Sequence, residues 1–585
     1  MKRIVNGLGS FWYQRLAKRL VLLSLVGALM TASAPVVAHV EEDAPTEPAR
    51  VLGEISFPTT AASDEAQQAF IRGMLLLHLF EYELAREEFV HAQQLEPGFV
   101  MAYWGEAMTF NHPIWDEQDQ PAALAALAKL GATPEERLAT TSDLREQAFL
   151  QSLDALYGTG GKAERDRAYL LAMERMAAQF PQDHEVQLFY ALALFGVQAG
   201  VRDTATYMFC TAIAQSVFSE NPHHPGAAHY LIHGVDDPEH AVLGLAAARA
   251  LAKMAPDAGH ALHMTSHIFT ALGMWNDVVL ANEAAIRKQN EVLVHQGKEP
   301  RHWGHYNFWL MYGYLQQGRY EAARELLKSA YEEAQADRKS PEDPMILDPD
   351  RSLHGSVVQM WARYLIETRD WNGGIAGWRF NLGDAFDPNL TLTFTLAMQA
   401  AHGGQAALAG SYLEQFRQLK LALGQALRSR TESAPTDALY LQRLEVLEQE
   451  LLAGIETARG DYPAAVTFAS EASRLEGEMP HSFGPPFIDW PAAELLGERL
   501  LEARKYADAA KAYETQLKRT RQRPRALLGL ARSEGKLGRE TIARHALEQL
   551  SVIWQEADPE VKAELERLIE APAGDPGTES TDVAR

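Results

Sequence analysis

Small and bulky residues recur in step along this chain at intervals of roughly 34 residues. The clearest unit contains Gly73, Leu76, Ala85, Phe89, Ala92 and Pro97. Related units contain Tyr314, Gly318, Tyr320, Ala323 and Ala330, then Gly460, Tyr462, Ala465 and Ala472, then Gly497, Leu500, Tyr506, Ala509 and Tyr513. This period is typical of repeated helix pairs, because small residues let helices approach closely while large residues fill the gaps. The recurrence predicts an all-α protein.

The spacing resembles that of the tetratricopeptide repeat (TPR) family over most of residues 63–570, more weakly over about 110–220 and 335–445. The resemblance implies an α-solenoid, or superhelix, of TPR-like antiparallel helix pairs. Such stacks usually bind peptides or partner proteins in a concave groove. A fold of this kind does not define what occupies the groove.

The sequence divides into seven expected segments. They are a signal peptide (1–38), a flexible acidic and Pro-rich linker (39–62), N-terminal TPR-like helices (63–220), a His-rich TPR-like segment (221–335), degenerate helical repeats (336–445), C-terminal TPR repeats (446–570) and a disordered tail (571–585).

The first segment has the composition of a secretory signal. Lys2, Arg3, Arg15, Lys18 and Arg19 precede the apolar run at 20–30, and no acidic residue lies before position 38. The run is shorter than the roughly 20 residues that a membrane-spanning helix needs. We expect cleavage near position 38 and a periplasmic or secreted protein. Membrane association requires that the signal be retained.

Charge and motif content exclude several functions. The chain has 54 basic and 78 acidic side chains and a net charge of -24, which argues against nucleic acid as a partner. Its single cysteine, Cys210, excludes an intrachain disulfide and any multi-cysteine metal site. The chain contains no GxSxG, Walker or GxGxxG motif, so serine hydrolysis, nucleotide binding and dinucleotide binding have no support.

Histidine is concentrated in one short segment. Of the 20 histidines, eight lie between positions 223 and 267. His229 and His233 are four residues apart on a predicted helix that begins at Pro225, so their rings share one face. His260, His263 and His267 form a stripe on a later helix. If these helices lie side by side, the five rings converge on a site for zinc or copper.

Two alternatives to a metal site fit the same residues. The rings could form a buried polar network with Asp236, Asp237 or Asp257, which would set the helix register. They could instead be catalytic, although HExxH is absent and no glutamate base lies between the paired histidines. If the superhelix curls, further ligands could come from His112, His302, His305 and His354.

The two blocks PGAAHYLIHGVDDPEHA and APDAGHALHMTSHIFTALGMWND also resemble those of a group of exported bacterial TPR proteins with no established activity. The resemblance implies that the blocks act as one unit. It implies no substrate.

Aromatic residues gather in two further segments. We predict that a binding groove is lined by Tyr103, Trp104, Trp303, Tyr306 and Trp309. The interpretation that the repeats favour over a groove is that these residues fill the core between units, as large side chains in such units commonly do.

Together these features favour an exported TPR scaffold that mediates protein or peptide interactions and is not an enzyme. The alternative is a metal-binding protein, either a carrier or a metal-dependent hydrolase, that uses the histidines of 223–267. A third hypothesis, an assembly factor associated with lipid or peptidoglycan, requires a retained N-terminal segment.

Overall fold

The computed structural model describes residues 50–198, 201–337, 343–430 and 435–570. The predicted signal peptide and C-terminal tail lie outside these ranges. The first part of the described chain forms the helices α1 (Asp64–His78), α2 (Tyr82–Leu95), α3 (Val100–Met108), α4 (Gln120–Ala128), α5 (Pro134–Leu138), α6 (Leu144–Leu156), α7 (Lys162–Gln179), α8 (His184–Gly196) and α9 (Thr204–Glu220).

The middle part forms α10 (Pro225–Val235), α11 (Leu245–Met254), α12 (Gly259–Leu272), α13 (Trp275–His295), α14 (His305–Gln316), α15 (Tyr320–Ala336) and α16 (Leu353–Thr368). The last part forms α17 (Phe386–His402), α18 (Ala406–Arg428), α19 (Pro435–Arg459), α20 (Tyr462–Glu478), α21 (Ala492–Glu502), α22 (Tyr506–Arg519), α23 (Pro524–Lys536), α24 (Glu540–Ile553) and α25 (Pro559–Glu570).

Extended structure is minimal in the described ranges. The strands β1 (Asn111–His112) and β2 (Glu117–Gln118) pair antiparallel, with Asn111 opposite Gln118. Short 3-10 helices cover Pro113–Trp115, Ala241–Gly244, Pro349–Arg351 and Gly374–Gly377. The predicted all-α class is therefore confirmed. None of the described helices combines the length and apolar character of a membrane span.

The sequence starts these helices with ordinary capping chemistry. Ser63 accepts a hydrogen bond from the Ala66 amide at the start of α1, and Asp183 does the same for two amides of α8. Pro225 and Pro524 occupy the first turns of α10 and α23, where the missing N–H costs no hydrogen bond.

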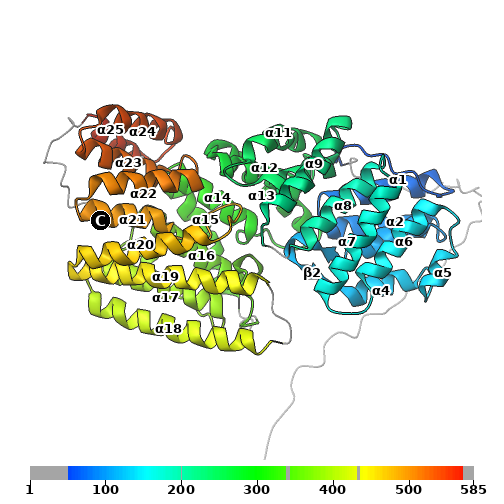
Figure 1. Cartoon of the computed structure of the whole chain (residues 1–585), viewed down its shortest axis with the longest axis horizontal. Helices are drawn as coiled ribbons and strands as arrows, with labels where there is room; N and C mark the ends of the chain where they lie inside the picture. Colours follow the sequence, from blue (N-terminus) through cyan, green and yellow to red (C-terminus); the bar gives the residue numbers. More distant parts are fainter. Residues whose placement is uncertain (1–49, 199–200, 338–342, 431–434, 571–585) are drawn as a thin grey trace, which may run out of the picture. The chain divides into compact units, whose positions relative to one another are not determined.

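The period in the sequence arises from how an aromatic ring sits between small residues of successive repeats. A Cβ added to Gly73 of α1 or to Gly105 of α3 would lie 2.7 or 2.4 Å from the Phe89 ring of α2. Tyr513 of α22 is enclosed in the same way by Gly497 and Gly529. Because only glycine leaves room for these rings, the helices stack as the TPR-like pairs visible in Figure 1, where α19 and α20 lie side by side.

The described part of the expected linker differs from that expectation. Residues 50–62 form no helix, yet Leu52 and Phe57 are buried in the N-terminal core. The Glu54 amide donates to the His223 carbonyl at 2.9 Å, which holds this segment against the start of α10. The segment packs without regular secondary structure because Leu52 and Phe57 are buried against the helices of this core.

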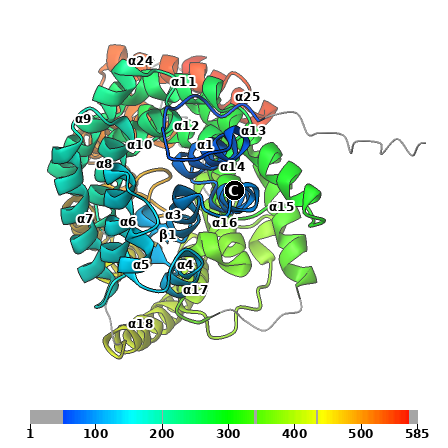
Figure 2. The ribbon, with the colours of Figure 1, turned by 90° about the vertical axis from the view of Figure 1, so that its right-hand side faces the viewer.

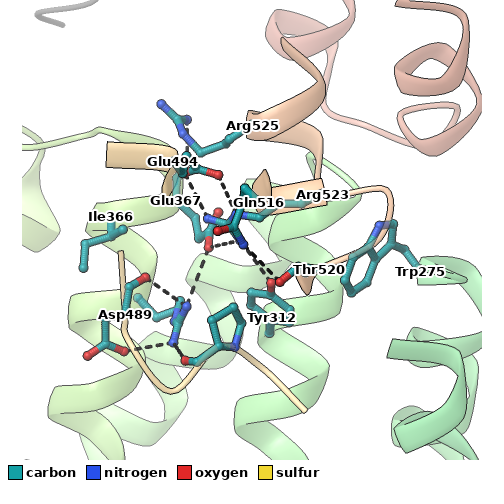
Figure 3. Close-up of polar contacts among 12 residues, drawn as sticks. Trp275, Tyr312, Ile366, Glu367, Asp489, Glu494, Gln516, Thr520, Arg523 and Arg525 are labelled. Carbon is teal, nitrogen blue, oxygen red and sulfur yellow. Dashed lines mark hydrogen bonds and ion pairs between the residues drawn. The ribbon is translucent and has the colours of Figure 1, made fainter. Parts of the chain in front are cut away.

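A buried ion network joins helices distant in sequence (Figure 3). Arg523, which precedes α23, donates to both carboxylate oxygens of Glu494 in α21 at 2.6 and 3.1 Å. It also pairs with Glu367 of α16 at 2.9 Å and donates to the Tyr312 hydroxyl of α14 at 3.0 Å. Since all four side chains are buried, this network ties the last repeats to the middle ones.

Candidate metal centre

Helix α10 presents two histidines on one face. The ring centroids of His229 and His233 are 4.9 Å apart, and both side chains are buried. Pro225 starts this helix, and it ends at Val235, before Asp236. The segment therefore forms the short helix that its proline and acidic turn predict.

Helix α12 brings three more histidines to the same place. It carries His260, His263 and His267 and ends at Leu272. The next residue, Gly273, has the left-handed φ of 71° typical of the position after a helix. Helices α10 and α12 lie beside each other and near α1 (Figure 2). The ring centroids of His229 and His260 are 5.1 Å apart, so the two stripes converge.

The first of two groups of ligand atoms is formed by His229, His233 and His260, which we call triad 1. One ring nitrogen from each lies within 4.8 Å of the others. Within the described ranges, the Nε2 atoms of all three rings are buried and have no hydrogen-bond partner. Such unsatisfied polar atoms are rare in proteins, so these three nitrogens are candidate ligand atoms.

The second group, triad 2, consists of His263, His267 and His305. Their ligand atoms also lie within 4.8 Å of one another. His305 is the first residue of α14, outside the His-dense segment. The Nε2 atoms of His263 and His267 are only 3.3 Å apart.

The outer nitrogens of His229 and His263 are hydrogen-bonded to acceptors. The Nδ1 of His229 lies 2.7 Å from the His78 carbonyl oxygen, and that of His263 lies 2.7 Å from the Asn282 Oδ1. The Asn282 amide group donates to the Val278 carbonyl, which turns its oxygen toward His263. Since these partners only accept, the proton is on Nδ1 and the lone pair is on the inward Nε2.

Carboxylates hold two rings of triad 2. Asp236 lies 3.0 Å from the Nδ1 of His267, and Asp350 lies 2.5 Å from the Nδ1 of His305. Arg202 holds Asp236 in place at 2.6 Å. Histidines that bind metals characteristically donate their other ring N–H to a carboxylate or carbonyl in this way.

Burial keeps most of these rings neutral, which is the form that binds a metal. Burial lowers the pKa of His229 to about 3 and lowers the pKa values of His233, His260 and His263 well below their usual range. His305 differs. Burial lowers its pKa, but the Asp350 carboxylate opposes this and the net shift is upward.

Aromatic side chains wall the centre. Tyr306 stacks on His263 with centroids 4.5 Å apart, and its hydroxyl lies 3.2 Å from the Nδ1 of His260. Trp309 stacks on His267 at 4.5 Å. Phe483, which is 39% exposed, stacks on the same ring at 5.1 Å, so solvent lies one ring away from the centre.

The five predicted groove aromatics do not share one surface. Only Tyr306 and Trp309 contact the histidines. Trp104 is fully buried and packs edge-on against Phe149 and Phe189 in the N-terminal core.

The other two predicted groove aromatics lie apart from the centre. Buried Tyr103 donates to the Pro97 carbonyl at 2.9 Å. Trp303 is partly buried beneath the Arg301 guanidinium, 4.4 Å from its ring centroid.

A third buried group has a different character. Glu185 lies 2.7 Å from the Nε2 of His78 and 3.2 Å from the Nε2 of His224. The outer Nδ1 atoms contact the Tyr230 hydroxyl at 2.9 Å and the Ala227 amide at 3.3 Å. Every imidazole nitrogen of this group has a partner, so it is a closed polar network of the kind that the alternative hypothesis describes.

The remaining histidines considered as ligands do not join either triad. His112 pairs with Glu117 at 3.2 Å, and His302 pairs with Glu333 at 2.5 Å. His354 lies 3.7 Å from Asp337. Of the four added candidates, only His305 reaches the centre. Its signal in the sequence was its position at a helix start beside Tyr306 and Trp309.

This chain resembles several solved helical-repeat structures at low sequence identity. The yeast Tom70 structure is 12% identical and covers 86% of this chain and 93% of its own, with a TM-score of 0.27. The human IFIT1 dimer with m7Gppp-AAAA is 14% identical, covers 85% and 96%, and has a TM-score of 0.33. The P58(IPK) TPR domain is 13% identical, covers 81% and 98%, and has a TM-score of 0.20.

No family model and no curated protein matches the sequence. TM-scores this low carry no argument about function. The helix pairs and their glycine–aromatic packing define a TPR-like helical repeat protein.

Proposed function

We propose that this chain binds a transition-metal ion of the zinc or copper class through the imidazoles of α10 and α12. The supporting observation is that the Nε2 atoms of His229, His233 and His260 are buried without partners, in three rings that each offer a nitrogen within 4.8 Å of the others. Zinc and copper favour neutral imidazole, whereas magnesium and calcium require oxygen ligands. Three protein ligands leave a tetrahedral ion one open position, as in catalytic zinc sites.

A closed polar network accounts less well for triad 1. In the group of His78, Glu185 and His224, each proton has an acceptor and each lone pair has a donor. In triad 1 the three buried Nε2 atoms have no partner, and that of His229 carries a lone pair, which costs free energy unless a ligand or ion satisfies it. A bound ion removes that cost.

Interaction with a protein or peptide partner stays a prediction from the TPR-like fold. Export to the periplasm or beyond is likewise proposed from the basic and apolar composition of residues 1–38 alone.

The test is elemental analysis of the purified full chain after loading with zinc or copper and removal of free metal. We expect at least one ion per chain, and loss of that ion in His229→Gln/His233→Gln. His402→Gln is the matched control, because His402 stacks on Trp371 away from both triads. Wild-type protein that holds no metal after loading overturns the proposal.

Thermal unfolding with and without metal gives a second measure of binding that does not depend on the folding of the double variant. Binding to the folded state alone must raise the Tm of the wild type and of His402→Gln. A Tm of the wild type that is unchanged by saturating zinc and copper also contradicts the proposal.

A further inference from the structure

We infer that the centre takes two ions side by side, one on each triad, and binds a small anion at their open positions. This inference rests on the proposed metal binding and goes further, because it assigns His263, His267 and His305 a second ion. It makes the centre a dinuclear one.

The number of inward ligands exceeds what one ion takes. Six imidazoles converge, in two groups of three whose ligand atoms each lie within 4.8 Å of one another. A zinc ion takes four ligands in a closed site, and three plus a solvent molecule in a catalytic one. Two ions with three imidazoles each use all six rings.

The two triads are close neighbours. The ring centroids of His233 and His267 are 5.8 Å apart, and those of His260 and His263 are 6.2 Å apart. These distances between the triads are similar to the ring-centroid distances within triad 2, which are 4.6 Å for His263 and His305 and 6.4 Å for His267 and His305. Ions on the two triads are therefore neighbours, as in two-metal sites.

Two side chains position both triads at once. Asp236 lies 3.0 Å from the Nδ1 of His267 and 4.0 Å from the Nδ1 of His233. Tyr306 contacts His260 through its hydroxyl and stacks on His263. These shared contacts make the triads one structural unit, with Asp236 and Tyr306 as positioning residues.

Charge balance gives the class of ligand. Neither triad contains a carboxylate, so two divalent ions add positive charge in a buried site. Asp236 forms a further candidate ligand group with His233 and His267, but it approaches both rings at Nδ1 and is partly neutralised by its ion pair with Arg202. Asp236 and Asp350 contact only the outer nitrogens, and Arg202 already pairs with Asp236. A small anion bound at the open positions would supply the missing charge, and two adjacent ions favour an anion that contacts both.

The test is titration of the metal-free full chain with Cu(II), followed by copper analysis and electron paramagnetic resonance. We expect two copper ions per chain, and a detected spin count well below the copper content because neighbouring Cu(II) spins couple. His229→Gln and His305→Gln should each bind one copper that gives a full, uncoupled signal. His305 is partly exposed, so its substitution tests triad 2 with little disturbance of the core.

The outcomes separate the two proposals. No bound copper or zinc in the wild type refutes metal binding itself. One ion per chain, or two ions with full uncoupled signals, leaves metal binding intact and overturns the dinuclear centre. Azide is the anion probe. A new visible absorption band on adding azide to the two-copper form supports the anion site, and an unchanged spectrum refutes it.

Discussion

The Nε2 atoms of His263 and His267 lie 3.3 Å apart. Each ring directs its Nδ1 toward an acceptor, Asn282 for His263 and Asp236 for His267. Two lone pairs therefore face each other in a buried site. A cation between or beside them, either a proton or a metal ion, stabilises this arrangement.

Removal of the acceptor behind a ligand should weaken metal binding without removing any ligand. Asn282→Ala leaves the Nδ1–H of His263 without its partner. Loss of such an outer contact lowers metal affinity by roughly 10- to 100-fold. Competition with a chromophoric chelator measures the change. Asn290→Ala in the same helix is the control and should leave the affinity unchanged. It loses the bond donated to the Arg301 carbonyl and the bond accepted from the Arg301 amide. Equal losses in both variants would contradict the role of Asn282.

Overpacking should show how the repeats depend on glycine. A Cβ at Gly529 would lie 2.1 Å from the Tyr513 ring, so Gly529→Ala should lower the free energy of unfolding by about 1–3 kcal/mol. Gly535→Ala in the same helix meets nothing within 4 Å and should be neutral or stabilising by up to about 1 kcal/mol. Urea unfolding compares the two. A stabilising Gly529→Ala would contradict the packing argument.

The buried ion network should be sensitive to loss of its cation. Arg523→Leu leaves the Glu494 and Glu367 carboxylates buried without their main partner, which should cost about 3–5 kcal/mol of unfolding free energy. Arg532→Ala breaks a surface pair with Glu564 and should cost at most about 1 kcal/mol. Chemical denaturation measures both, and similar small losses would show that the network contributes little.

Stability should depend on pH through Asp387. Burial raises its pKa to about 6, against the opposing effects of Arg443 and of the Tyr440 hydroxyl at 2.6 Å. Because the folded pKa exceeds the unfolded one, the stabilising contribution is present below about pH 4 and is lost as the pH rises to 6.

Asp387→Asn removes this dependence and keeps an oxygen that accepts from Tyr440. The unfolding free energy of the variant minus that of the wild type should therefore increase by about 2 kcal/mol between pH 4 and pH 7. Denaturation at several pH values gives this difference. A value that stays constant with pH would contradict the raised pKa.

The repeat period made the fold predictable, because it records local contacts. The ring of Phe89 must fit between Gly73 and Gly105, so the spacing of these residue types repeats along the chain. A repeated spacing of this kind can be found in the sequence alone. Residues 50–62 were mispredicted as part of a flexible linker because their packing depends on distant residues, as the bond from Glu54 to His223 shows.

The histidine stripes could be predicted from helical spacing alone. What spacing could not provide was the approach of α14, which brings His305 beside His263, or the direction of each Nδ1. Trp104 lies in the N-terminal core and not on a groove surface for a related reason. Burial of an aromatic residue depends on neighbours such as Phe149, which the sequence does not specify. Such contacts arise from tertiary packing.

The most direct test of the account is anomalous diffraction from crystals of the zinc- or copper-loaded protein at the absorption edge of the metal. The account predicts an anomalous peak about 2 Å from the Nε2 atoms of His229, His233 and His260. Water molecules hydrogen-bonded to these three nitrogens, with no anomalous peak at either triad, would contradict it.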